Sequence, residues 1–292
     1  MKKILITGAG SYIGTRVADY LARWPDQYRV DTLDMQDPAW RKTSFAGYDS
    51  IFHVAGIAHS DVGNITEEQR SLYYRVNTDL AIETAEKAKA DGACQFIFMS
   101  SAIVYGPSAG LGKIKRITDR TPLAPENCYS DSKAKAEAGI LPLSNEGFRV
   151  VVLRPPMIYG PGSKGNYPAL AKLARKLPVF PLVENERSML YVENLAEFVR
   201  LMIENREEGI FWPQNGEYVN TSRMARQIAL AHGKKLILIP GFTWALKLLG
   251  NLTPLVEKAF GNLSYDMALS QYRENYRIKS FEESIRETEG VS

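Results

Sequence analysis

Residues 4–14 read Ile-Leu-Ile-Thr-Gly-Ala-Gly-Ser-Tyr-Ile-Gly, and this stretch decides the fold. Its first four residues have the apolar character of a short buried strand, and apolar residues then recur at helical spacing up to Trp24. Glycines between a strand and a helix let the backbone approach a pyrophosphate, whose charge the N–H groups at the helix start can bind. The stretch therefore predicts a dinucleotide site. Its predicted cofactor-binding residues are Gly8, Ser11, Tyr12, Ile13 and Gly14.

Further strand patterns alternate with helices over the first half of the chain. A long helix that opens with the capping box Thr66 to Gln69 precedes a buried strand ending at Ser100. Alternation of this kind implies right-handed βαβ units, so we expect an α/β fold with a Rossmann-like, doubly wound parallel sheet. The strands are predicted at residues 4–7, 29–34, 50–54, 95–100 and 149–153.

Beyond residue 162 the pattern changes to helical stretches separated by turns. We predict an NAD-binding Rossmann domain at 1–162, joined by a returning segment near 188–212, and a smaller C-terminal α/β substrate domain at 163–292. Helices are predicted at 168–176, 194–204, 222–232 and 243–260, and a strand at 235–239. The helix from Thr243 is amphipathic, which fits packing on the first domain or, alternatively, contact with a membrane surface.

Composition excludes several classes of function. The 292 residues have a formal net charge of +3, too small an excess to indicate a nucleic-acid partner. Two cysteines give no disulfide framework, and three histidines lack metal-ligand spacing, so we expect a cytoplasmic protein without a metal site. His53 and His59 are interpreted as buried or loop histidines. No apolar run approaches the roughly 18 residues of a transmembrane helix.

An acidic residue selects the dinucleotide. Asp34 follows Gly14 by 20 residues, at the end of the second predicted strand. A carboxylate there accepts hydrogen bonds from the adenosine ribose and repels a 2′-phosphate, which favours NAD. Arg41 and Lys42 lie nearby, so NADP stays open.

A second motif carries the chemistry. Ser101 follows a buried strand, and Tyr129 and Lys133 lie four residues apart, on one face of a predicted helix. A lysine beside a phenol lowers the phenol's pKa from about 10, which makes tyrosinate available near neutrality. The serine can hydrogen-bond the same substrate oxygen. We therefore predict a catalytic proton relay of Ser101, Tyr129 and Lys133 beside the nicotinamide.

Together these motifs resemble the extended short-chain dehydrogenase/reductases, specifically the NAD-dependent epimerase/dehydratase family that acts on nucleotide sugars. Further landmarks are His53-Val54-Ala55-Gly56, Asn77 and the segment from Arg154 to Gly162. The resemblance implies a homodimer formed through the helices after Thr66 and Tyr129. It also implies that Tyr129 and Lys133 bind the cofactor, Lys133 by holding the nicotinamide ribose. It adds four more residues to the cofactor site: Ala55, Gly56, Asn77 and Pro156. Its implied substrate-binding residues are Asn166, Tyr167 and Arg187, the last of which clamps the nucleotide diphosphate.

Three departures from the family pattern narrow the reaction. Ala102 and Ile103 stand where the 4,6-dehydratases have an Asp-Glu pair, so dehydration is not expected. Met157 replaces an asparagine that contacts substrate in the UDP-galactose 4-epimerases. The interval from Asp34 to Ser50 is too short for a full crossover helix, so one strand of the usual sheet is expected to be shortened or missing.

The resemblance implies a UDP-hexose or UDP-N-acetylhexosamine 4-epimerase with tightly held NAD, in surface-polysaccharide synthesis. A reductase of a nucleotide-linked 4-keto-6-deoxy sugar would use the same residues and NAD(P)H, so the sequence leaves both open. A nonenzymatic dinucleotide sensor is the third alternative, although this chain retains the Tyr-Lys pair. The amphipathic Thr243 helix also leaves open a lipid-linked sugar substrate.

Overall fold

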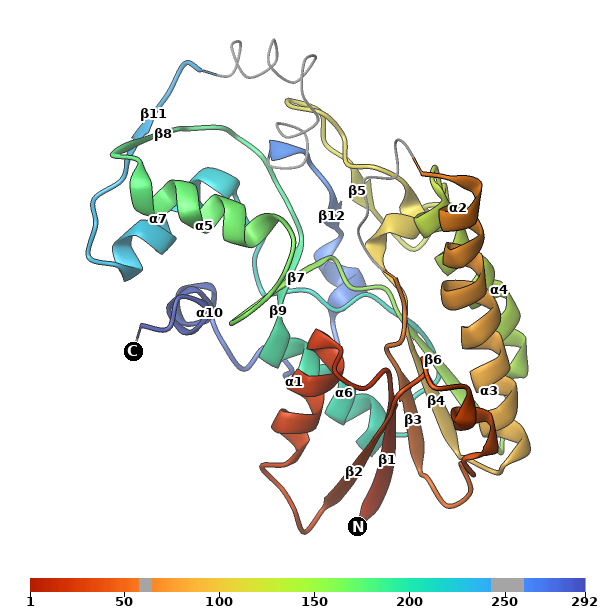
Figure 1. Ribbon diagram of the computed structural model, residues 1–292. Helices are drawn as coiled ribbons and strands as arrows, with labels where there is room; N and C mark the ends of the chain where they lie inside the picture. The colour runs from red at the N-terminus through yellow and green to blue at the C-terminus, as the bar shows by residue number, and fades with distance from the viewer. Residues whose placement is uncertain (58–64, 243–259, 292) are drawn as a thin grey trace.

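The structure, a computed structural model, describes residues 1–57, 65–242 and 260–291. At its centre lies a six-stranded parallel sheet in the order β10-β6-β4-β3-β1-β2 (Figure 1). The predicted doubly wound α/β fold is therefore confirmed. The strands are β1 (Lys2–Thr7), β2 (Tyr28–Leu33), β3 (Ser50–His53), β4 (Gln95–Met99), β6 (Arg149–Leu153) and β10 (Gly209–Phe211).

Helices cover both faces of the sheet because side chains alternate along each strand. Ile4 and Ile6 of β1 pack toward α1 (Tyr12–Leu21) and α6 (Val192–Glu204). Leu5 packs on the opposite face with α3 (Leu80–Ala90) and α4 (Cys128–Ile140). Figure 1 shows α3 and α4 side by side along that face. Three fully buried alanines let α3 approach the sheet closely: Ala81, Ala85 and Ala88.

The strand order reverses at β1, which pairs with β2 on one side and β3 on the other. In open parallel sheets, ligands bind beyond the carboxyl ends of the strands at this reversal. Between Asp34 and Ser50 the structure has the short 3₁₀ helix Pro38–Lys42 instead of a strand, as the short interval predicts. Among the described residues, β2 is therefore the edge strand on this side of the sheet.

The helix predicted after Thr66 consists of two α-helices joined by a π turn. Its capping box is confirmed: Gln69 N donates to Thr66 Oγ1 at 3.2 Å, and Thr66 N donates to Gln69 Oε1 at 2.9 Å. After α2 (Glu67–Tyr74), residues 75–79 form the π turn, and α3 follows. The wider turn lies in the part of the helix that carries the buried Asn77.

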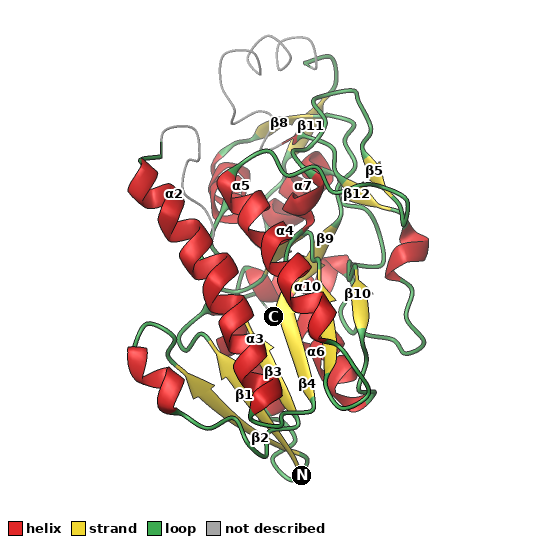
Figure 2. Ribbon diagram, turned by 90° about the vertical axis from the view of Figure 1, so that its right-hand side faces the viewer, coloured by secondary structure: helices red, strands yellow, loops and turns green. Residues whose placement is uncertain are grey.

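The second half of the chain builds a separate apolar core beyond the carboxyl ends of the strands (Figure 2). Its helices are α5 (Asn166–Lys176), α7 (Thr221–Ala231) and α10 (Phe281–Thr288), and its strands β8 (Val179–Pro181) and β11 (Ile237–Ile239) pair in parallel. Two further strand pairs connect the halves. They are β7 (Met157–Tyr159) with β9 (Met189–Tyr191), and β5 (Arg116–Ile117) with β12 (Ser264–Tyr265).

After β9 the chain returns to the central sheet as α6 and β10. The division at residue 162 stays a prediction. The predicted helix from Thr243 lies outside the described residues, apart from its last residue. Among the residues that the structure describes, no helix is long and apolar enough to cross a membrane.

Candidate active site

The glycine loop joins the carboxyl ends of three adjacent strands. The N–H groups of Gly8 and Ala9 donate to the Leu33 carbonyl of β2 at 2.9 and 3.1 Å. Gly8 has a φ of +115°, and a Cβ there would lie 2.8 Å from the backbone nitrogen of Ala55, after β3. Only glycine fits both the conformation and this close approach.

The start of α1 faces the same place. Ser11 caps the helix, because its Oγ accepts from Gly14 N at 3.2 Å. Tyr12 and Ile13 are the first helical residues, and their N–H groups lie where an α-helix offers donors to an anion. A Cβ on Gly14 would lie 3.0 Å from both Ile6 Cγ2 and Val54 Cγ2, so glycine is needed for helix and strands to pack. The close packing and the helix start fit the predicted pyrophosphate site, which stays a prediction.

Asp34 is exposed directly after β2, and its Oδ1 accepts from Gln36 N at 2.9 Å. The carboxylate therefore has a fixed orientation beside the glycine loop. Arg41, which left NADP open, donates from Nη2 to Glu83 Oε2 at 2.6 Å. This ion pair competes with any contact between Arg41 and a 2′-phosphate.

We expect Asp34→Ala to weaken NAD binding by about ten- to a hundredfold, because a hydrogen bond to a charged group contributes about 1.5–3 kcal/mol. The preference for NAD over NADP should narrow at the same time. Calorimetric titration with both dinucleotides measures this. Asp37→Ala is the matched control, since Asp37 caps the 3₁₀ helix through Ala39 N instead. An unchanged NAD-to-NADP ratio in Asp34→Ala would contradict the assignment.

His53 is fully buried, as predicted, and has a structural position rather than an acid-base role. Its Nδ1 hydrogen-bonds Thr7 Oγ1 at 2.8 Å, and its ring stacks on two rings of the neighbouring strand β4, those of Phe96 and Phe98. Burial, with a smaller effect of the Lys133 charge, lowers the pKa of His53 to about 3. The ring is therefore neutral near pH 7. His59 lies outside the described residues.

The low pKa of His53 predicts acid sensitivity. Unfolding exposes a histidine with an ordinary pKa of about 6.5, so the unfolded state binds more protons and stability falls as pH drops below that value. At pH 5 the loss from this residue is about 2 kcal/mol. Urea unfolding of wild type and His53→Gln should show their stability difference shrinking by this amount between pH 7.5 and 5. A difference independent of pH would refute the prediction.

Asn77 connects the segment after β3 with the helix of the Tyr-Lys pair. Its Oδ1 accepts from Ile57 N at 2.8 Å, while its Nδ2 donates to Ile57 O and to Ser132 Oγ, both at 3.1 Å. A Cβ on Gly56 would lie 3.1 Å from Asn77 Oδ1 and 3.3 Å from Lys133 Nζ. The structure thus brings Gly56, Asn77 and Lys133 together.

Helix α4 presents Tyr129 and Lys133 in its first two turns. Asn127 caps it by accepting from Ser130 N at 2.9 Å. The Lys133 ammonium is buried, donates to the Met99 carbonyl at 2.9 Å, and lies 4.6 Å from the centre of the Phe98 ring. Burial lowers the pKa of Lys133 to about 8, and the carboxylate of Glu137 opposes that shift.

Ser101 hydrogen-bonds the Tyr129 side chain, and the Tyr73 ring packs 6.2 Å away. Burial raises the pKa of Tyr129 above its ordinary value, and the hydrogen bond from Ser101 opposes this only in part. The predicted lowering of the Tyr129 pKa by Lys133 is not seen, because desolvation of the phenolate is the largest cause and Lys133 is not among the groups that shift this pKa. In the chain alone, Tyr129 is therefore a neutral phenol near pH 7.

A buried ion pair behind the relay was missed by sequence reasoning. Glu137 follows Lys133 by one turn on α4, and its carboxylate accepts from Arg154 Nε at 3.1 Å and Nη2 at 2.5 Å. Ser100 also donates to Glu137, and Arg154 Nη1 donates to Tyr105 Oη at 2.7 Å. The i+4 spacing from Lys133 was the available signal. The ion pair therefore joins α4 to the end of β6, and the hydrogen bond from Ser100 joins the same carboxylate to the end of β4, just before Ser101.

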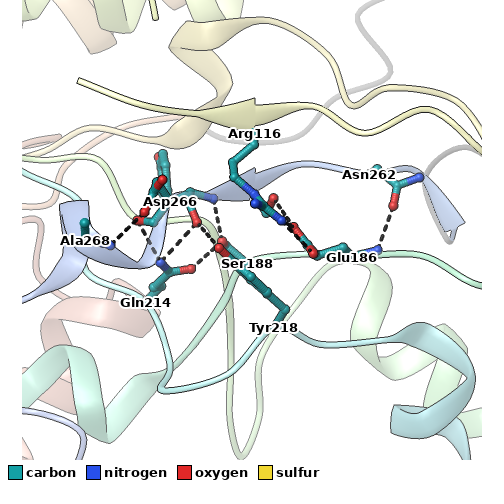
Figure 3. Close-up of polar contacts among 10 residues, drawn as sticks. Arg116, Glu186, Ser188, Gln214, Tyr218, Asn262, Asp266 and Ala268 are labelled. Carbon is teal, nitrogen blue, oxygen red and sulfur yellow. Dashed lines mark hydrogen bonds and ion pairs between the residues drawn. The ribbon is translucent and has the colours of Figure 1, made fainter. Parts of the chain in front are cut away.

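Polar contacts join the neighbours of Arg187 in sequence, Glu186 and Ser188, to the strands β5 and β12 (Figure 3). Glu186 accepts from both Arg116 and Ser264, at 2.9 and 2.6 Å. Ser188 accepts from Tyr265 N at 2.8 Å, and Tyr265 Oη donates to the Arg154 carbonyl at 2.7 Å. A chain of hydrogen bonds therefore runs from the residue after Arg187 to the Glu137 pair.

Arg187 itself forms backbone bridges with Val219 and Leu263. Burial lowers the pKa of its guanidinium, although an arginine stays charged. Because the Arg187 guanidinium is largely buried, little water would screen its attraction to an anion. This arrangement suits the predicted contact with the substrate diphosphate. That role stays a prediction.

The other predicted residues divide between surface and core. Asn166 is exposed at the start of α5. The Tyr167 side chain packs into the C-terminal core instead of facing the relay: its ring stacks on Tyr159 at 5.7 Å and its hydroxyl donates to Glu289 at 2.9 Å. Pro156 is buried just after β6. For Tyr167, only a backbone contact with substrate stays predicted.

The model of the NAD dependent epimerase/dehydratase family matches residues 4–212. The chain therefore belongs to this family of extended short-chain dehydrogenase/reductase enzymes, whose cofactor is NAD. It is 28% identical over 297 residues to a UDP-glucose 4-epimerase of Vibrio cholerae, covering 91% of this chain and 88% of that protein.

Solved structures agree with the fold. RMD from Pseudomonas aeruginosa, complexed with NADPH, matches with a TM-score of 0.75 at 18% identity, covering 99% of both chains. UDP-glucuronic acid 4-epimerase from Bacillus cereus, in complex with NAD, matches with a TM-score of 0.71 at 15% identity, covering 99% of this chain and 96% of that one. These two structures carry different dinucleotides on the same fold.

Proposed function

We propose that this protein is a nucleotide-sugar 4-epimerase that acts on a UDP-linked hexose or N-acetylhexosamine through transient oxidation at C4. The observation that carries the proposal is that Tyr129 and the buried Lys133 lie one turn apart on α4, while Ser101, whose side chain lowers the pKa of Tyr129, follows β4. The family membership and the Vibrio cholerae relative support the nucleotide sugar as substrate. We also propose, as the resemblance implies, a homodimer in the cytoplasm.

The residues after Ser101 speak against dehydration. Elimination of water across C5 and C6 of a sugar needs an acid and a base besides the relay. Ala102 is buried and Ile103 is aliphatic, so neither can transfer a proton. The Ser101 hydroxyl instead caps the short 3₁₀ helix that contains them, accepting from Ile103 N at 3.3 Å. The relay therefore supports oxidation and reduction at a single carbon.

The chain offers NAD a fitting site. The start of α1 would hold the pyrophosphate, Asp34 the adenosine ribose, and Lys133 the nicotinamide ribose, with Ala55, Gly56 and Asn77 bordering the ring. A Cβ at Gly8 would meet the Ala55 backbone, and one at Gly56 would meet Asn77 and Lys133, so both glycines let these segments pack closely. Bound NAD supplies a hydride acceptor and donor, and its positive ring favours tyrosinate.

Each side chain of the relay has a separate role in the transfer of the proton. As tyrosinate, which the bound cofactor and Lys133 would favour, Tyr129 would take the proton of the sugar 4-hydroxyl on Oη and later return it to the same oxygen. Ser101 donates a hydrogen bond to that oxygen and so orients it. The charge of Lys133 stabilises the tyrosinate, while Arg187 would hold the diphosphate as the sugar turns over between the two half-reactions.

Incubation of purified protein with UDP-glucose or UDP-N-acetylglucosamine, without added NAD(P)H, tests the proposal. We expect conversion to the galacto epimer, detected by NMR of the sugar. A reductase of a 4-keto-6-deoxy sugar would leave both substrates unchanged and consume NAD(P)H in proportion to a 4-keto substrate. That second outcome would overturn the epimerase assignment while retaining the same relay.

A further inference from the structure

A surface of the C-terminal half carries exposed aliphatic side chains in a row. Leu173 and Leu177 lie one turn apart at the end of α5, and Val179 of β8 pairs in register with Ile237 of β11. Each of the four is between 42% and 52% exposed. Since Phe180 and Leu236 are buried on the inner side, the pleat directs Val179 and Ile237 outward.

Lysines border this row on both elements. Lys172 and Lys176 lie on the exposed side of α5, and Lys234 and Lys235 are exposed just before β11. Lys234 Nζ donates to the Arg175 carbonyl at 2.8 Å, which joins the two basic segments. We name the four aliphatic residues together with these four lysines the basic-apolar surface.

No acidic residue interrupts the two segments. Residues 161–183 and 218–242 contain neither Asp nor Glu. The carboxylate of Glu289, which approaches from α10's end, is buried and contacts Arg175 Nη1 at 3.0 Å and His232 Nε2 at 2.7 Å. Two exposed carboxylates contact the second segment, Glu217 and Glu282, and both are paired with Arg223, at 2.6 and 2.9 Å. Among the described residues, no ion pair joins a carboxylate to any of the four lysines.

We propose that the basic-apolar surface binds a bilayer that contains anionic phospholipids. Aliphatic side chains that project between lysines can enter the boundary between headgroups and acyl chains, while the ammonium groups contact lipid phosphates. A second copy of the chain fits less well, because a two-fold contact would place the same lysines against each other. A nucleic acid backbone would leave the four aliphatic side chains without a partner.

The position of the surface suits such contact. In Figure 1, β8 and β11 lie at the end of the molecule opposite the N-terminus and the amino ends of the central strands, and Figure 2 shows them at that end again. The protein would therefore bind with the central sheet pointing away from the bilayer. The inference does not depend on which sugar reaction the relay performs.

Flotation of the full chain with vesicles tests the proposal. We expect binding to phosphatidylcholine vesicles that contain phosphatidylglycerol, little binding to phosphatidylcholine alone, and release at high salt. Lys172→Glu/Lys176→Glu should weaken binding by at least about 25-fold, since each basic residue near an anionic surface contributes about a fivefold factor. Leu173→Ser/Ile237→Ser should weaken it as well, and these exposed positions tolerate serine without loss of the core.

The matched control is Lys3→Glu/Lys42→Glu, which makes the same change in net charge at exposed lysines outside this surface. It should float like the wild type. The proposal is overturned if wild type does not bind phosphatidylglycerol vesicles, or if both surface variants bind as well as the control. It is also overturned if the surface variants change the mass measured by light scattering, because the surface would then join two copies of this chain.

Discussion

Tyr129→Phe is expected to reduce turnover by about a hundred- to ten-thousandfold, the range of a lost general acid-base group. The phenylalanine keeps the ring that packs on Tyr73 but removes the hydroxyl that hydrogen-bonds Ser101. The unfolding midpoint should change little, because the variant keeps the aromatic ring and loses a single hydroxyl. Steady-state kinetics measures turnover, and urea unfolding measures the midpoint.

Tyr73→Phe is the matched control for this variant. It removes a hydroxyl from the neighbouring buried ring and should leave turnover within a small factor of wild type. Equal losses in the two variants would mean that the tyrosine pair acts through packing. A Tyr129→Phe enzyme with full turnover would exclude Tyr129 as the proton-transferring group.

Glu137→Gln is expected to have the largest effect on stability. The substitution keeps the side chain's shape but leaves the buried Arg154 guanidinium without its counter-charge, which costs about 3–5 kcal/mol. Urea unfolding measures the loss. The double variant Glu137→Leu/Arg154→Met should recover much of it, because replacing a whole buried pair by apolar groups is often neutral.

The Glu137→Gln variant also tests whether Glu137 acts on Lys133 or only stabilises the fold. Glu137 raises the pKa of Lys133, so Glu137→Gln should lower that pKa below about 8. Lys133 must be charged to stabilise tyrosinate, so the alkaline limb of kcat/KM should move to lower pH. Glu197→Gln, at the partly buried Arg200 pair, is the control and should leave the profile unchanged. An unmoved profile in Glu137→Gln would make the Glu137 pair structural only.

Local patterns predicted the parts of the fold that depend on neighbours in sequence. The glycine loop, the Thr66 capping box and the strand at residues 95–99 follow from turn chemistry, capping and apolar runs. The missing strand after Asp34 followed from chain length alone. Tyr129 and Lys133 share helix α4, as their spacing predicted, whereas their joint action with Ser101 stays a prediction.

What could not be predicted depends on contacts between distant segments. Arg154 appeared only as the first residue of a family segment, and nothing in its neighbours indicates the carboxylate of Glu137 as its partner. The π turn around Asn77 depends on packing against α4. The raised pKa of Tyr129 follows from desolvation, which a spacing rule does not contain. Tyr167 matched a family position, yet its ring stacks within the C-terminal core.

The central claim is that one carbon is oxidised and reduced within a single active site. The most direct test is incubation of the enzyme, without added NAD(P)H, with UDP-glucose or UDP-N-acetylglucosamine that carries deuterium at C4. We predict that the galacto product keeps the deuterium at C4, as measured by NMR and mass spectrometry. A product that has exchanged the label with solvent, or a reaction that proceeds only when NAD(P)H is consumed, would contradict the account.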